Sequence, residues 1–250
     1  MMPRTNAARR ESYFSQSREP LTAFVAVLPL FAAYQVGILL TGGVRNGVDF
    51  VSSILMSLFG GDLAPYLALN AVVLLVFLIA VALLRRSGSL HPRLFPFMLL
   101  ESALYAVMVG GVVNLLMNLT GVSSLLSVPP LRAAEASPGL IYKLVMSVGA
   151  GLYEELVFRL MLLGGLFWAM VRGGVGRVVA GVIAVVVSSL VFSGVHHLGS
   201  MGEAFTLGAF TFRFFAGVVF AALYQVRGFA IAAWTHALYD IWVMVFLGVD

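Results

Sequence analysis

The stretch LTAFVAVLPLFAAYQVGILL, residues 21–40, contains no charged side chain. A helix of about 20 residues rises about 30 Å, which is the thickness of the hydrocarbon core of a bilayer. The preceding residues, MMPRTNAARRESYFSQSREP, are polar and basic. A signal peptide has a shorter apolar core with a small-residue cleavage site close behind it. We therefore interpret residues 21–40 as a retained first transmembrane helix.

The composition of the chain excludes several classes of protein. Of the 250 residues, 61% are hydrophobic and 10% are charged, whereas a soluble domain carries about 25% charged residues. There is no cysteine, which excludes disulfides, thiolate catalysis and cysteine ligands for zinc. The net charge of +4 is not gathered in a basic patch interleaved with aromatic residues, so we expect no nucleic-acid partner.

Seven apolar stretches are long enough to span a bilayer. They lie near residues 21–41, 65–84, 94–118, 140–171, 177–198, 205–226 and 228–249. We predict an all-α protein, a polytopic transmembrane helical bundle with about seven spans. The chain then consists of a basic N-terminal segment, 1–20, and a single transmembrane domain, 21–250. Small residues such as Ser147 and Gly151 would allow close packing of helices.

The loops between the predicted spans alternate between basic-rich and basic-poor. Short cytoplasmic loops collect Lys and Arg, so we expect an integral protein of the cell or plasma membrane, with its N-terminus in the cytoplasm and its C-terminus outside. The proline-containing segment 126–139 is interpreted as an irregular external loop. The basic N-terminal segment is expected to contact anionic membrane lipid.

The stretch GLYEELVFRLMLL, residues 151–163, places three charged side chains, Glu154, Glu155 and Arg159, inside a predicted span. Such residues are rare at membrane depth and usually functional. Glu155 and Arg159 are four positions apart, so on a helix they face each other and can form an ion pair. Glu154 points about 100° away around the helix. This direction gives it a separate task, that of a general base or acid.

Two further motifs place histidines inside predicted spans. They are Phe192-x-x-x-His196 in SSLVFSGVHHLG and His236-x-x-x-Asp240 in AAWTHALYDIWV. Asp240 lies one helical turn from His236 and can fix its tautomer or line the same pocket. With Glu154, three helices offer a base candidate, imidazoles that share protons and donors for an oxyanion. The predicted boundaries, however, put His196 near the outer end of its span and His236 nearer the inner end of its own.

Other ionisable residues in or near the predicted spans receive no chemical role. Glu101 and Arg213 are expected to pair with each other or to line the cavity, while His91 and His197 are expected at the membrane interface. The aromatic run FTFRFFAGVVF, residues 210–220, is interpreted as lipid-facing and packing surface rather than as a ligand site.

The ordered trio EELVFR, FSGVH and HALYD resembles the pattern of the CPBP (ABI) family of intramembrane proteases, which includes type II CAAX prenyl proteases and bacteriocin-processing membrane endopeptidases. The resemblance covers about residues 140–245 and implies an all-helical, membrane-embedded endopeptidase with its catalytic core in this region. It also implies that Glu154 activates a water molecule with the assistance of His196. His236 and Asp240 would correspond to the oxyanion site.

The resemblance assigns supporting roles to Glu155, Arg159 and Phe192. The third motif ends in Asp240, where some members of the family have Asn. An ionised carboxylate cannot donate a hydrogen bond to an oxyanion, so Asp240 would have to be protonated or act through His236.

We therefore predict an intramembrane endopeptidase that hydrolyses a peptide bond in a membrane-associated or lipidated peptide or protein, without a resident cofactor. A zinc-dependent variant stays open, because Glu154, His196, His236 and Asp240 are all acceptable zinc ligands, although the chain has no H-E-x-x-H motif. A second alternative is a non-catalytic membrane scaffold, immunity protein or transporter, because intramembrane carboxylates and histidines also build proton relays.

Overall fold

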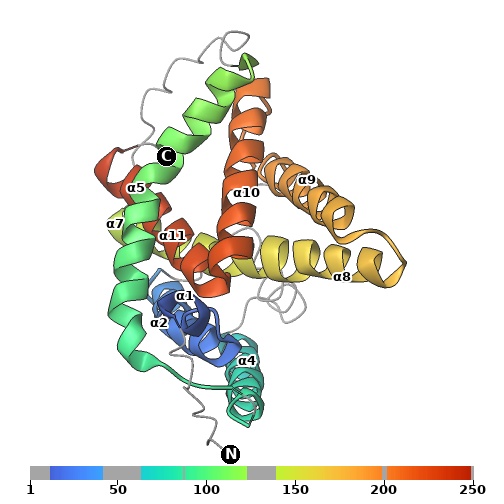
Figure 1. Cartoon of the computed structure of the whole chain (residues 1–250). Coiled ribbons are helices and arrows are strands. Elements are labelled where there is room, and N and C mark those ends of the chain that lie inside the picture. Colours follow the sequence, from blue (N-terminus) through green and yellow to red (C-terminus); the bar gives the residue numbers. More distant parts are fainter. Residues whose placement is uncertain (1–11, 42–62, 87, 123–138, 199–201, 249–250) are drawn as a thin grey trace, which may run out of the picture.

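The structure of the chain, a computed structural model, describes residues 12–41, 63–86, 88–122, 139–198 and 202–248. Every regular element within these ranges is a helix (Figure 1), so the predicted all-α class is confirmed. The elements are α1 (Tyr13–Gln16), α2 (Pro20–Leu40), α4 (Leu63–Leu84), η1 (Pro92–Leu94), α5 (Phe95–Leu119), α7 (Leu140–Gly149), η2 (Ala150–Leu163), α8 (Gly164–Arg172), α9 (Arg177–Val195), α10 (Leu207–Arg227), α11 (Phe229–Ile241) and η3 (Trp242–Phe246). Residues 1–11 of the N-terminal segment and most of the loop expected at 126–139 lie outside the described ranges.

Five helices in the described part of the chain are long and apolar enough to cross a membrane. They are Pro20–Leu40, Pro92–Leu119, Arg177–Val195, Leu207–Arg227 and Phe229–Phe246. The two other predicted spans correspond to α4 and to a helical rod in which α7, η2 and α8 follow one another without interruption.

Large apolar side chains cover the outer faces of these helices. Leu100, Leu119 and Val178 are examples, with exposed fractions of 70%, 74% and 81%. The surface of a soluble protein is covered mainly by polar and charged side chains. This apolar surface is instead suited to contact with lipid tails, which offer no hydrogen bonds.

Helix α11 forms the centre of the bundle. It packs against α2, α5, α7 and η2, and its residues Ile231, Ala232, Ala233 and Ala237 are completely buried. Small side chains allow neighbouring helices to approach closely, which is how helices associate in a membrane where no hydrophobic effect drives them together.

Gly151 marks the closest approach of η2 to α11. A Cβ atom added at this glycine would lie 2.5 Å from the carbonyl oxygen of Ala233 and 2.6 Å from the backbone nitrogen of Ala237. Both are backbone atoms that cannot turn aside, so only glycine fits here. The predicted packing role of Gly151 is confirmed, and this contact fixes the distance between the two helices that carry the first and third motifs.

Helix α9 is one unbroken helix that is inclined to α10 (Figure 1). It ends at Val195, so His196 is its C-cap residue, whereas His236 lies in the middle of the α11–η3 rod. The sequence predicted that the two histidines would lie at different depths in the membrane. They do not, because the C-terminal end of α9, which carries His196, lies level with the middle of α11, which carries His236. The site described below depends on this placement.

A polar cluster outside the three motifs ties the N-terminal segment to the bundle. Arg227 at the end of α10 donates from Nη2 to Glu101 Oε2 on α5 over 2.8 Å and to Ser17 Oγ over 3.1 Å. The hydroxyl of Tyr13 donates to the same Glu101 carboxylate. Burial and the neighbouring carboxylate raise the pKa of this tyrosine, which keeps the hydroxyl protonated as a donor.

The expected pairing of Glu101 with Arg213 is therefore wrong. Arg213 pairs instead with Glu203, with 2.7 Å between Nε and Oε1. The physical reason is position along α10, because Arg213 and Arg227 are separated by 14 residues, or about 21 Å of helix. Glu101 lies beside the end of α10 that carries Arg227.

Candidate active site

The first motif lies on a π-helix, η2, which runs from Ala150 to Leu163. In a π-helix each turn contains more residues than in an α-helix, so consecutive side chains diverge by less than about 100°. Both glutamates contact His236 on α11, Glu154 on the Nε2 side and Glu155 at Nδ1. The sequence-based interpretation assumed α-helical geometry and did not anticipate this.

Glu155 links the first motif to the third. Its Oε2 atom lies 3.3 Å from Arg159 Nε, so the predicted ion pair is confirmed, and both side chains are at most 1% exposed. Its other oxygen, Oε1, accepts a hydrogen bond from Nδ1 of His236 over 2.8 Å. Glu155 thus neutralises a buried cation and orients an imidazole at the same time.

The guanidinium of Arg159 lies under aromatic rings. Its Cζ atom is 4.3 Å from the ring centroid of Phe192 and 5.5 Å from that of Phe220. The rings attract the cation through their negative faces. This contact gives Phe192, which the second motif singled out, a clear structural part in the site.

Glu154 lies between the two imidazoles and is almost completely buried. Its Oε2 atom is 3.7 Å from Nε2 of His196 and 3.8 Å from Nε2 of His236. These separations exceed a direct hydrogen bond. Both imidazoles present the same ring nitrogen to the same carboxylate oxygen.

The tautomer of His196 follows from its other nitrogen. Nδ1 lies 2.7 Å from the backbone carbonyl of Phe192, and a carbonyl can only accept. The proton is therefore on Nδ1, and in the neutral ring Nε2 is an acceptor that faces Glu154. His236 Nδ1 donates to the Glu155 carboxylate in the same way.

Asp240 lies beside His236 without a direct hydrogen bond to it, since its Oδ2 atom is 3.7 Å from Nε2. Asp240 was expected either to fix the tautomer of His236 or to line the same pocket, and this position fits the second expectation. The hydrogen bond that sets the tautomer of His236 comes from Glu155, a residue of another helix.

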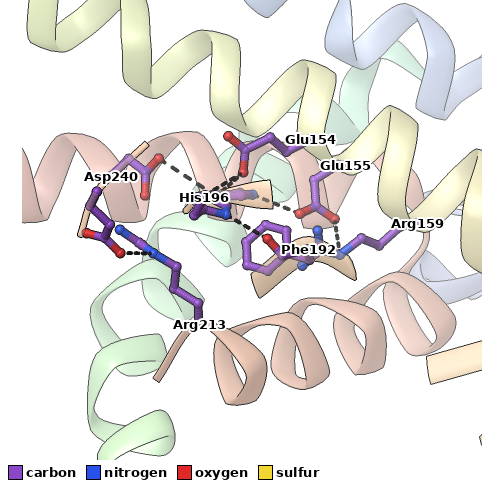
Figure 2. Close-up of polar contacts among 9 residues, drawn as sticks. Glu154, Glu155, Arg159, Phe192, His196, Arg213 and Asp240 are labelled. Atoms are coloured by element: carbon purple, nitrogen blue, oxygen red, sulfur yellow. Dashed lines mark hydrogen bonds and ion pairs between the residues drawn. The ribbon is translucent and has the colours of Figure 1, made fainter. Parts of the chain in front are cut away.

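The structure thus brings all of the sequence-predicted site residues into one cluster (Figure 2). It also contains a residue that sequence reasoning missed, because Phe220 stacks on the imidazole of His236 with 4.3 Å between the ring centroids and 18° between the planes. Phe220 belongs to the aromatic run that was interpreted as lipid-facing and packing surface. Nothing distinguishes it there from its neighbours, since a stacking partner on another helix leaves no trace in local sequence.

Across the described ranges, no three His, Asp or Glu side chains are grouped in a way that would hold a metal ion.

The fold and this cluster define a helical membrane protein with a buried carboxylate–imidazole site. Residues 136–242 match the family model described as type II CAAX prenyl endopeptidase Rce1-like, and the match includes all three motifs. Neither a curated protein nor a solved structure matches the chain. Within residues 136–242 the chain therefore resembles the CAAX-protease (CPBP) family, and the five membrane-span-capable helices of the described ranges support an integral membrane protein.

Proposed function

We propose that the protein is a glutamic-type intramembrane endopeptidase that hydrolyses a peptide bond in a membrane-associated, prenylated protein. The observation that carries this proposal is the position of Glu154, whose carboxylate oxygen faces Nε2 of both His196 and His236 at 3.7 and 3.8 Å. The substrate class comes from the matched family.

In the proposed reaction a water molecule between these groups loses a proton to Glu154, with His196 as a second acceptor at the same place. The water oxygen attacks the carbonyl carbon of the scissile bond, and the carbonyl oxygen becomes an oxyanion. The C–N bond then breaks, and the proton held by Glu154 passes to the leaving amine. Each step conserves charge without any further reactant.

His236 stabilises the oxyanion when its Nε2 carries a proton. Glu155 supports this state because its carboxylate faces Nδ1 of the same ring over 2.8 Å. Asp240, on the Nε2 side, contributes either as a protonated donor or through His236. The ion pair with Arg159 holds the Glu155 carboxylate in place.

The test is cleavage of a panel of fluorogenic peptides, prenylated and unmodified, by the purified protein in liposomes. Glu154→Gln keeps the size of the side chain and removes the base, so we expect activity to fall by about 10²- to 10⁴-fold without loss of folding. His196→Ala should also lose activity. Glu19→Gln, at the N-cap of α2 and outside the site, is the matched control and should cleave normally.

Full activity of Glu154→Gln would overturn the mechanism. Activity lost with a chelator and restored by zinc would favour the metal-dependent alternative. A cellular phenotype that survives both Glu154→Gln and His196→Ala would favour a scaffold, an immunity protein or a transporter.

We propose further that the protein resides in the cell membrane with its N-terminus in the cytoplasm. Three segments expected on the cytoplasmic side lie together, since Arg227 at the α10–α11 turn contacts Ser17 and the hydroxyl of Thr22 donates to the carbonyl of Ser89 over 3.1 Å. In this orientation the loop that contains Glu203 faces outside.

A further inference from the structure

Arg213 lies near the catalytic cluster without a part in the mechanism. It occupies the second turn of α10, and its only hydrogen bond among the described residues joins Nε to Oε1 of Glu203 over 2.7 Å. Its side chain is 31% exposed. The other cation of the site, Arg159, is 1% exposed and is held by Glu155.

The partner of Arg213 is fixed next to the catalytic histidine. The backbone N–H of Glu203 donates to the carbonyl of His196 over 3.0 Å, and the carbonyl of Glu203 lies 3.2 Å from Nδ1 of His197. The ring of His197 packs on Phe205 with 5.1 Å between centroids. These contacts hold Glu203 at the C-terminal end of α9, so Glu203 holds Arg213 at the edge of the site.

Arg213 lies beside the site itself, since Figure 2 shows its guanidinium on the side of the cluster where Asp240 lies. Apart from Arg159, which Glu155 holds, the charged groups that surround the reacting position, Glu154 and Asp240 above all, are acids. A substrate group with a negative charge would be repelled there unless a cation received it.

The guanidinium is suited to receive such a group. A planar fork of donors matches the two oxygens of a carboxylate, and Arg213 uses only Nε for Glu203, so its two Nη groups form no hydrogen bond within the described part of the chain. An exposed fraction of 31% leaves these groups accessible.

We propose that Arg213 is a specificity-determining residue that binds a carboxylate of the substrate peptide close to the scissile bond. This inference rests on the proposed endopeptidase function. The carboxylate is either the C-terminal one of the substrate or that of an Asp or Glu side chain, and both present the same chemistry to the guanidinium.

The test compares matched peptides in the liposome assay: one with a free C-terminal acid, the same peptide with a C-terminal amide, and a pair with Asp or Asn near the scissile bond. We expect the wild-type protein to prefer one acidic member over its neutral partner. Arg213→Gln should raise KM for the acidic peptide by about 10- to 100-fold, the loss expected for a charged hydrogen bond. It should leave kcat and the cleavage of the neutral peptide nearly unchanged, and Arg213→Lys should retain part of the preference.

Glu203→Gln is the control for a purely structural role of the ion pair. This variant breaks the same ion pair. If the pair only holds Glu203 against α10, Glu203→Gln and Arg213→Gln will both reduce the cleavage of acidic and neutral peptides alike. That result would overturn the inference, as would a wild-type protein that does not distinguish acidic from neutral peptides. Cleavage by the wild type and its loss in Glu154→Gln test the endopeptidase function separately in the same assay.

Discussion

Replacing Gly151 by alanine should disable the site without changing any of its side chains. The added Cβ would meet the Ala233 carbonyl oxygen at 2.5 Å and the backbone and Cβ of Ala237 at 2.6 Å. Since backbone atoms cannot move independently, η2 and α11 must separate. Reaching an ordinary contact of 3.4 Å from 2.6 Å requires about 0.8 Å of displacement (3.4 − 2.6).

This displacement acts directly on the contacts between the two helices. The hydrogen bond of 2.8 Å between Glu155 and His236 would open to about 3.6 Å, beyond hydrogen-bond range. A misplacement of about 1 Å can reduce catalysis by about 10²-fold. The overpacking itself costs about 1–3 kcal/mol of stability.

The measurement is kcat/KM on the best peptide of the panel, together with thermal unfolding of the purified protein in detergent. Gly165→Ala is the matched control, because it makes the same change in the same helical rod where an added Cβ meets nothing within 4 Å. We expect near-normal activity for Gly165→Ala and a loss of about 10²-fold for Gly151→Ala. Equal activities for the two variants would refute the idea that the close approach of η2 and α11 sets the geometry of the site.

Three further predictions concern buried charge, ring stacking and orientation. Glu155→Gln should destabilise the protein by about 3–5 kcal/mol because it leaves Arg159 as an uncompensated buried charge, while the double variant with Arg159→Met should regain stability but not activity in the same thermal and kinetic assays. Phe220→Leu should remove the stacking on His236, worth about 0.5–1.5 kcal/mol, and lower kcat more than KM, whereas an unchanged kcat would show that the stacking does not position the imidazole. Because the chain has no cysteine, a single cysteine placed at Ser12 or at Phe205 reports its side of the membrane, and an impermeant thiol reagent on intact cells should label only the Phe205 variant.

The sequence was sufficient for the helical class, for the approximate bounds of the spans and for the motif residues of the cluster, although it did not indicate Phe220. Apolar stretches of spanning length and isolated charges inside them are local features, which is why they can be identified without a structure. The ion pair between Glu155 and Arg159 was predictable for the same reason, since four positions along one helix determine it.

Features that depend on how helices meet were not predictable. The π-helical geometry of η2, the approach of the C-terminal end of α9 to the middle of α11 and the stacking of Phe220 on His236 all involve contacts between segments far apart in sequence. Glu101 and Arg213 are an example, because both lie inside predicted spans and have opposite charges. Glu101 nevertheless pairs with Arg227, which lies about four helical turns from Arg213 along α10, and Arg213 pairs with Glu203.

The cluster of Tyr13, Ser17, Glu101 and Arg227 has a consequence for biosynthesis. Ser17 and Arg227 are 210 positions apart, so the contact between them cannot form until all of the intervening residues have been translated. A chain that stops before Arg227 keeps Glu101 inside a span without its cation. Such an incomplete product carries Glu101 at membrane depth without the guanidinium that neutralises it in the fold, and a carboxylate in that position is costly.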